Sequence, residues 1–274
     1  MKNTKSKRLY LLAGLSALLL APVGAALGKP AQCITDDTKC DHDLLCAFKV
    51  ELAEKILLFE TFVANSPTTQ AARKGTLQGV KYNGKLYQAA LAEARAAEPG
   101  ATGDDLAALA YSRFTKKVRE KLRTESSKYK ECKSLGVTPN ETLRGTWTGM
   151  RTSKKDCTVY GDPPNDSEVG ISLDDLKKKS DGCLEIWESD RGHEAVHEDA
   201  CRRRLANRER PPLTLQNYID EDTEAYRYNV QHAANDLSKM QLLCTADPKT
   251  DDFRKRADDL LKKAAQYRAN QAGK

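Results

Sequence analysis

The chain has 274 residues, of which 45 are basic and 39 are acidic, so its formal net charge is +6. Because charges of both signs are mixed along the chain, and part of the basic excess lies near the N-terminus, the composition argues against a nucleic-acid-binding protein. The eight cysteines include no Cys-x-x-Cys pair, which argues against a zinc ribbon or a thioredoxin-type redox site.

The N-terminus has the three zones of a secretory signal peptide. Basic residues precede an apolar run over 10–20, and small residues follow. We therefore predict that residues 1–28 are a signal peptide, cleaved after Gly28, Ala25 or Ala26, and that the protein is exported to a periplasmic or extracellular space. The apolar run is shorter than the roughly 20 residues that span a membrane. We expect no integral membrane segment after cleavage; a retained N-terminal anchor is the alternative.

All the cysteines lie behind the predicted cleavage site, which favours up to four disulfides in an exported protein. Eight cysteines allow about 105 pairings, and their spacing does not select one. The cysteines are Cys33, Cys40, Cys46, Cys132, Cys157, Cys183, Cys201 and Cys244.

The first region behind the signal peptide, residues 29–131, is predicted to be helical. Apolar residues recur at helical spacing over 41–65, and an Ala-rich helix over 85–97 follows. After a Pro-Gly break, a long helix capped by Asp104 is expected to run to about Lys130.

Residues 132–170 are rich in Gly, Pro, Thr and Asn, and helical periodicity disappears there. We predict an irregular loop or linker, or a small β excursion around 146–150 and 157–160. The last region, 171–274, returns to helical patterning with two proline-containing breaks. Its expected helices cover 172–179, 184–207, 214–243 and 251–269.

These patterns predict a mostly α protein, built as one or two disulfide-stabilised helical domains with an irregular central segment. The roughly 246 residues that follow the signal peptide suffice for one large domain or two small ones.

The C-terminal region also contains a chemical motif. The chain has four histidines, and two of them, His193 and His197, flank Glu194 in a His-Glu-x-x-His pattern. Residues four apart lie on one helix face, so both imidazoles can reach one Zn²⁺. Glu194 can take a proton from a zinc-bound water and pass it to a leaving amine. The motif therefore predicts a zinc-dependent hydrolase.

A catalytic zinc site needs a third protein ligand, and the following helix offers Glu221, Asp222 and Glu224. At 100° per residue, Asp222 falls inside the apolar stripe of that helix, whereas Glu221 and Glu224 project to the opposite side and remain alternatives. Burying an unpaired carboxylate is costly, so Asp222 is expected to meet a partner. Zinc is one candidate, and an arginine such as Arg203 or Arg204 is the other.

The motif at 193–197, followed about 25 residues later by an acidic helix, resembles the zincin metallopeptidases and, within them, the gluzincin arrangement. The resemblance covers about residues 189–230. It implies a zinc peptidase acting on a peptide or protein, whose third ligand lies three residues before Ala225. That position is Asp222, where gluzincins carry glutamate. In many zincins a phenol or a histidine stabilises the oxyanion, and Tyr226, which is expected to face inward, is the candidate here.

The sequence leaves two hypotheses. The first is an exported zinc-dependent hydrolase, a metallopeptidase with His193, His197 and Asp222 as metal ligands and Glu194 as general base and acid. The second is a non-enzymatic, disulfide-stapled helical protein that binds an envelope, extracellular or host partner. The long N-terminal helices carry no chemical motif, which favours the second. The oligomeric state is open.

Overall fold

The computed structural model describes residues 32–35, 39–65, 84–125, 127–145, 149–153, 155–161, 171–179, 181–207, 215–245 and 251–272, and the predicted signal peptide lies outside these ranges. Most of the described residues are helical, which confirms the prediction of a mostly α fold. The helices are α1 (His42–Asn65), α3 (Gly84–Ala97), α4 (Gly103–Glu125), α5 (Ser127–Ser134), α6 (Pro139–Arg144), α7 (Leu173–Lys179), α8 (Leu184–Ala206), α9 (Leu215–Leu243) and α10 (Asp251–Ala272), and the strands are β1 (Met150–Thr152) and β2 (Val159–Gly161). None of these helices is both long and apolar enough to cross a membrane.

The predicted irregular segment contains the two short strands, but it also contains a helix that the sequence analysis missed. Pro139 stands at the first position of α6, where its missing N–H leaves no helical hydrogen bond unmade. The backbone N–H of Thr142 donates to the carbonyl of Thr138 at 2.9 Å. A helix of 6 residues is too short to display the 3.6-residue period on which the prediction relied. The long helix expected after Asp104 is described as two helices, α4 and α5.

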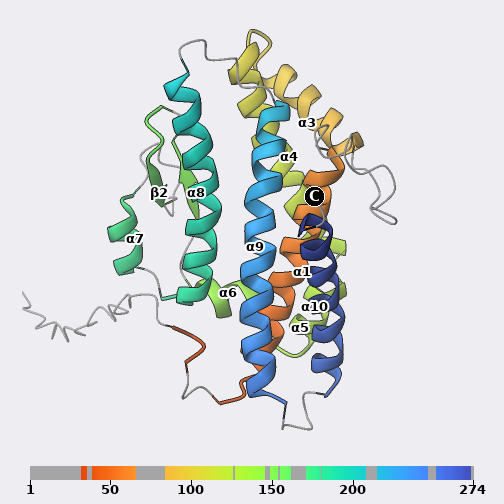
Figure 1. Ribbon diagram of the computed structural model, residues 1–274. Helices are drawn as coiled ribbons and strands as arrows, with labels where there is room; N and C mark the ends of the chain where they lie inside the picture. The colour runs from red at the N-terminus through yellow and green to blue at the C-terminus, as the bar shows by residue number, and fades with distance from the viewer. Residues whose placement is uncertain are drawn as a thin grey trace, which may run out of the picture.

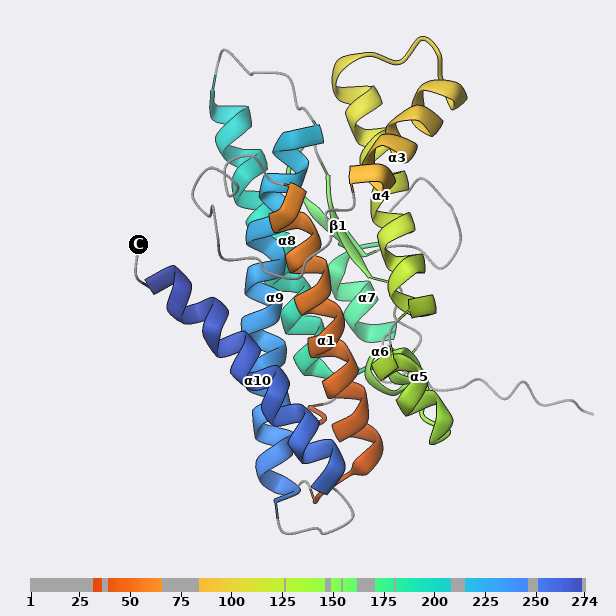
Figure 2. The same cartoon turned by 90° about the vertical axis from the view of Figure 1, so that its right-hand side faces the viewer.

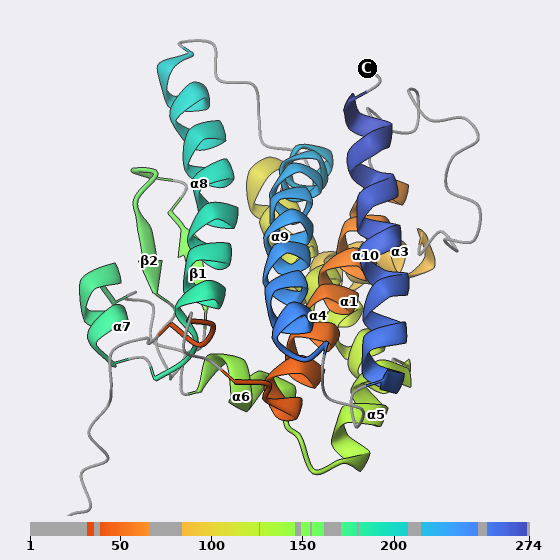
Figure 3. The ribbon, with the colours of Figure 1, turned by 60° about the horizontal axis from the view of Figure 1, so that its bottom comes forward.

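The helix α9 lies at the centre of the fold. Helices α1, α4, α8 and α10 all pack against it, and Figure 1 shows α1, α8, α9 and α10 side by side. Because α9 is contacted by several helices, its buried residues cover a broad face that runs from Ala225 through Ile219 to Ala234. Figure 3 shows α8 between α9 and the strands, with α7 beyond β2.

Two hairpins flank the middle of α8 and α9. Helices α3 and α4 pack on each other, and Phe114 of α4 contacts Phe62 of α1 edge-on, with ring centroids 5.6 Å apart. Strands β1 and β2 pair antiparallel, with Arg151 opposite Tyr160, and β1 packs on α8. Figure 2 shows β1 between α8 and α4. Residues of α4 and β1 therefore lie around the same region, where α8 packs on α9.

Four charged residues join α1, α6 and α8 in the interior. Arg144 donates to Asp190 at 2.6 Å and to Glu51 at 3.3 Å, and the ammonium of Lys55 lies 3.3 Å from Glu51 and 3.7 Å from Asp190. Burial would raise the pKa of Asp190, but Arg144 and Lys55 hold that pKa well below its usual range. Because Asp190 lies one turn before His193, this network fixes the part of α8 that carries the motif.

All eight cysteines are paired, which confirms the predicted disulfides and supplies the pairing that spacing left open. The disulfides are Cys33–Cys183, Cys40–Cys244, Cys46–Cys132 and Cys157–Cys201. Cys157–Cys201 ties the β-hairpin to α8 one turn after His197, so it anchors the motif helix directly.

Candidate metal centre

The two histidines of the motif lie on the side of α8 that faces α9. Their imidazole centroids are 5.0 Å apart, and their Nε2 atoms are separated by 3.3 Å. The side chains are 13% and 16% exposed, respectively, so the pair is accessible from a cavity but shielded from bulk water. The one-turn spacing in the sequence is thus realised as two nitrogens aimed at one point.

Asp222 of α9 completes this point. Its Oδ1 atom lies 3.5 Å from Nε2 of His193 and 3.5 Å from Nε2 of His197. The residue is 1% exposed, and Oδ1 has no hydrogen-bond partner among the described residues. Neither Arg203 nor Arg204 pairs with Asp222, since Arg203 contacts Asp199 and Arg204 contacts Glu221. The alternative arginine partner of Asp222 is therefore wrong.

The three ligand atoms have the separations that a tetrahedral metal requires. Ligands about 2.0–2.2 Å from a tetrahedral zinc lie about 3.3–3.6 Å from one another. The observed edges are 3.3, 3.5 and 3.5 Å, and His193, His197 and Asp222 form a group that can hold a metal ion. A buried carboxylate oxygen without a donor is also costly unless a cation satisfies it. The residues therefore fit a divalent cation with nitrogen and oxygen ligands.

A buried amide sets the tautomer of His193. Asn229, which is fully buried, donates through Nδ2 to the carbonyl and the hydroxyl of Ser189 at 3.0 and 2.9 Å. Its Oδ1 must then be the acceptor that faces Nδ1 of His193 at 2.6 Å. A proton on Nδ1 leaves the lone pair of Nε2 free for a metal, which is the usual arrangement around metal-binding histidines.

The prediction that Glu221 projects away from the site is wrong. Its Oε2 lies 3.4 Å from Nδ1 of His197, and its Oε1 accepts a hydrogen bond from Arg204. Glu221 is adjacent in sequence to Asp222, and its longer side chain reaches across to α8. Glu224 is 52% exposed and pairs with Arg227, as expected for the opposite side. Glu221 thus orients His197 in the way Asn229 orients His193.

Glu194, the acid of the motif, is buried beside the strand β1. The hydroxyl of Thr152 donates to its Oε2 at 2.7 Å. Burial raises the pKa of Glu194, while the imidazoles of His193 and His197 and the Thr152 hydroxyl act against that rise. A carboxyl group with a raised pKa is suited to both accepting and returning a proton near neutrality.

Two tyrosines contact two of the three candidate ligands, Asp222 and His193. The hydroxyl of Tyr111, from α4, donates to Oδ2 of Asp222. Tyr226 stacks on Phe62 with ring centroids 5.1 Å apart and meets His193 edge-on at 4.7 Å. Tyr226 is 3% exposed, so it faces inward as expected; its contact with an oxyanion stays a prediction.

The electrostatics of the centre favour a cation. Burial would raise the pKa of Asp222, but the two imidazoles facing it hold the pKa well below its usual range. Burial would lower the pKa of His197, yet the carboxylates of Asp222 and Glu221 raise it to about 10. Asp222 is therefore a carboxylate, and the space between these residues attracts positive charge, either a proton on His197 or a metal ion that displaces this proton.

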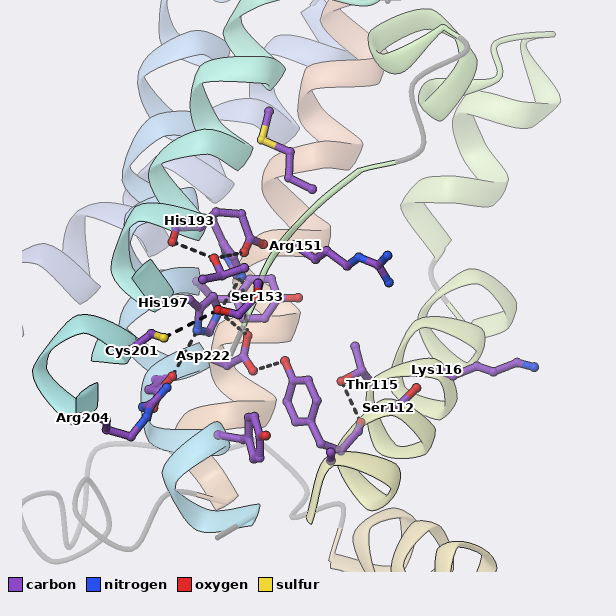
Figure 4. Close-up of a pocket in the computed structure, with 18 of the residues that line it drawn as sticks. Ser112, Thr115, Lys116, Arg151, Ser153, His193, His197, Cys201, Arg204 and Asp222 are labelled. Carbon is purple, nitrogen blue, oxygen red and sulfur yellow. Dashed lines mark hydrogen bonds and ion pairs between the residues drawn. The ribbon is translucent and has the colours of Figure 1, made fainter. Parts of the chain in front are cut away.

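A cavity of about 740 Å³ opens in front of the three candidate ligands. Figure 4 shows His193, His197 and Asp222 converging on one side of it, with Ser112, Thr115 and Lys116 of α4 on the other. Residues of β1, including Thr152, form a third wall. This volume lies within the range of sites for small or extended ligands, about 300–1,000 Å³.

Comparisons with protein-family models, curated proteins and solved structures found no match to this chain. The resemblance to zincins therefore stays a prediction that rests on the residues themselves.

Sequence analysis missed three residues that support the centre, namely Tyr111, Thr152 and Asn229, and it named Glu221 only as an alternative metal ligand. Glu221 and Asn229 lie on the helix of Asp222, but helical periodicity ranked residues only by the apolar stripe. Tyr111 and Thr152 lie in other elements, and no local pattern marks them. Asn229 carried one weak signal, because it falls 7 residues after Asp222 and thus on the same face of α9.

Proposed function

We propose that this protein is an exported zinc-dependent hydrolase that cleaves peptide bonds in a peptide or protein. The observation that supports it best is the triangle of Nε2, Nε2 and Oδ1 atoms, with edges of 3.3–3.5 Å, beside a buried glutamate of the same motif. A structural metal site would need no such glutamate and would be closed by a fourth protein ligand. Among the described residues, only these three form a group of this kind free of a disulfide.

In this proposal each residue has one task. His193, His197 and Asp222 hold the zinc. A bound zinc lowers the pKa of water towards about 7 and polarises a carbonyl group. Glu194 accepts the proton of the attacking water and later delivers it to the leaving amine. The hydroxyl of Thr152 keeps Oε2 of Glu194 in place, so that the carboxyl group does not rotate away.

An extended peptide is the substrate class that the surroundings favour. Among the described residues, β1 pairs with β2 along one edge only, and Arg151 and Thr152 of β1 line the cavity. An edge strand offers backbone groups to a chain lying beside it. The four disulfides suit an oxidising compartment, which together with the predicted signal peptide supports export.

The test is a pair of substitutions on α8. Glu194→Gln is expected to keep its zinc and to lose hydrolysis by about 100-fold or more, because it removes the proton acceptor but not a ligand. Glu198→Gln, on the same helix, removes a partly buried carboxylate that pairs with Arg191 and Arg202 and is expected to leave hydrolysis unchanged. Both variants and the wild type would be incubated with a peptide library, and new termini identified by mass spectrometry.

Equal hydrolysis by Glu194→Gln and wild type would contradict the proposal. A wild type that binds no metal and cleaves nothing would leave the second hypothesis, a disulfide-stapled helical binding protein.

A further inference from the structure

The carboxylate of Asp222 uses its two oxygens differently. Oδ1 faces the imidazoles of His193 and His197 at 3.5 Å, whereas Oδ2 accepts a hydrogen bond from the hydroxyl of Tyr111. Resting on the proposed function, we propose that Tyr111 is a positioning residue that restricts Asp222 to binding the metal through Oδ1 alone. Nothing in the motif on α8 points to this role, because Tyr111 belongs to α4.

Tyr111 is itself held in a defined place. Its ring stacks on Tyr218 of α9 with centroids 5.0 Å apart and an interplanar angle of 24°. The next turn of α4 places Phe114 against Phe62 in the core. The position of the Tyr111 hydroxyl next to Asp222 is therefore fixed by the helix α4 and by the ring contact with Tyr218. Preorganised support of this kind is what a ligand carboxylate requires.

The number of oxygens that Asp222 supplies decides how much of the metal is left for substrate. A catalytic zinc keeps three protein ligands and one open position. A carboxylate can also bind a cation through both oxygens, as it does with calcium, and this would fill the open position. The hydrogen bond from Tyr111 occupies the second oxygen, so the open position is preserved. Loss of the hydroxyl would release Oδ2 towards the metal.

In this inference, the hydrogen bond from Tyr111 to Asp222 affects how the metal is bound as well as the stability of the fold. These two effects can be measured separately. The experiment compares Tyr111→Phe with Tyr218→Phe, which removes the hydroxyl of the stacked neighbour and keeps both rings. Zinc affinity is measured by competition with a chromophoric chelator. Cobalt(II) is then substituted for zinc, because four-coordinate cobalt absorbs visible light more strongly than five- or six-coordinate cobalt. Thermal unfolding in EDTA reports the stability of each metal-free variant.

We expect Tyr111→Phe to bind zinc about 10–100-fold more weakly than the wild type, as other supporting residues of metal sites do, and to show a weaker cobalt spectrum. Tyr218→Phe is expected to match the wild type within about 3-fold in affinity and in its spectrum.

The inference is overturned if Tyr111→Phe retains wild-type affinity and spectrum, or if its unfolding temperature in EDTA falls while the spectrum of the loaded protein stays unchanged. If the wild type binds zinc and cleaves peptides, and Tyr111→Phe has the same zinc affinity and cobalt spectrum, only this inference is contradicted. If the wild type binds no metal, the proposed function is contradicted as well.

Discussion

At the scale of single residues, the hydroxyl of Thr152 is the clearest link between the β-hairpin and the chemistry. It donates to Oε2 of Glu194 at 2.7 Å, and Glu194 is 8% exposed. A hydrogen bond to a buried carboxylate contributes about 1.5–3 kcal/mol. Without it, the carboxyl group of Glu194 would sample orientations that do not reach the water it must activate.

Thr152→Val, which keeps the shape and removes the hydroxyl, is therefore predicted to lower the rate of hydrolysis by about 10–100-fold. Zinc affinity should stay within about 3-fold of wild type, since no ligand depends on Thr152. Thr152→Ser restores the donor and should recover most of the rate. A valine variant that hydrolyses peptides at the wild-type rate would show that Thr152 does not orient Glu194.

A second residue-scale prediction concerns pH. Nδ1 of His232 lies 3.0 Å from Oδ2 of Asp236, which is 1% exposed, and Lys239 contacts the other oxygen at 3.1 Å. The hydrogen bond with Asp236 raises the pKa of His232, although burial acts to lower it. Because the folded pKa exceeds the unfolded value of about 6.5, the pair stabilises the fold fully below that pH and loses its contribution as the pH rises through the folded pKa.

His232→Gln should therefore be less stable than wild type by about 1 kcal/mol at pH 6, a value reduced for partial solvent exposure. The difference in unfolding free energy should narrow by pH 9. Urea titrations in EDTA at both pH values measure it without a contribution from metal. A difference that is constant or grows with pH would contradict the assignment of the shift to His232.

The sequence predicted the centre only as far as one helix at a time. Helical periodicity placed His193 and His197 on one face of α8 and placed Asp222 inside the apolar stripe of α9, and the three do meet. The same argument wrongly placed Glu221 on the side away from the site, because the angular position of a residue around a helix does not account for the length of its side chain. Helical periodicity could not identify Tyr111, since it does not predict which helices pack against each other.

At the scale of elements, the disulfide Cys157–Cys201 holds the β-hairpin against α8, and both of the elements that it joins contribute residues to the site. Cys201 follows His197 by one turn and lines the cavity, and the hairpin carries Thr152. The disulfide Cys40–Cys244 joins the segment before α1 to the end of α9. Cys244 lies 22 residues after Asp222, which is about 33 Å along a helix. The two disulfides therefore form a matched pair, one near the site and one far from it.

Replacing either pair with alanines is predicted to lower the free energy of unfolding by about 2–4 kcal/mol. Only Cys157→Ala/Cys201→Ala should also lower hydrolysis, by about the 10–100-fold expected for losing the Thr152 contact, while its zinc content stays unchanged. Assays well below the unfolding temperatures separate the two effects. Equal hydrolysis by both double variants would mean that the hairpin does not depend on its disulfide for placement.

At the scale of the whole molecule, the centre exists only because distant parts of the chain meet. The candidate ligands come from α8 and α9, their supporting tyrosine comes from α4, and the charged network behind His193 reaches α1 and α6. The helical character of these elements followed from apolar periodicity and proline breaks. Their packing and the disulfide pairing did not, because both depend on contacts between residues up to 204 positions apart, which no local pattern encodes.

The zinc content of the oxidised wild-type protein, purified without chelators and dialysed after exposure to equimolar zinc, tests the central claim most directly. Elemental analysis that also covers iron, manganese and cobalt should find about one zinc per chain, because a site with three protein ligands binds a single ion. A folded protein that carries less than about a tenth of an equivalent of any of these metals would contradict the assignment of His193, His197 and Asp222 as a metal centre.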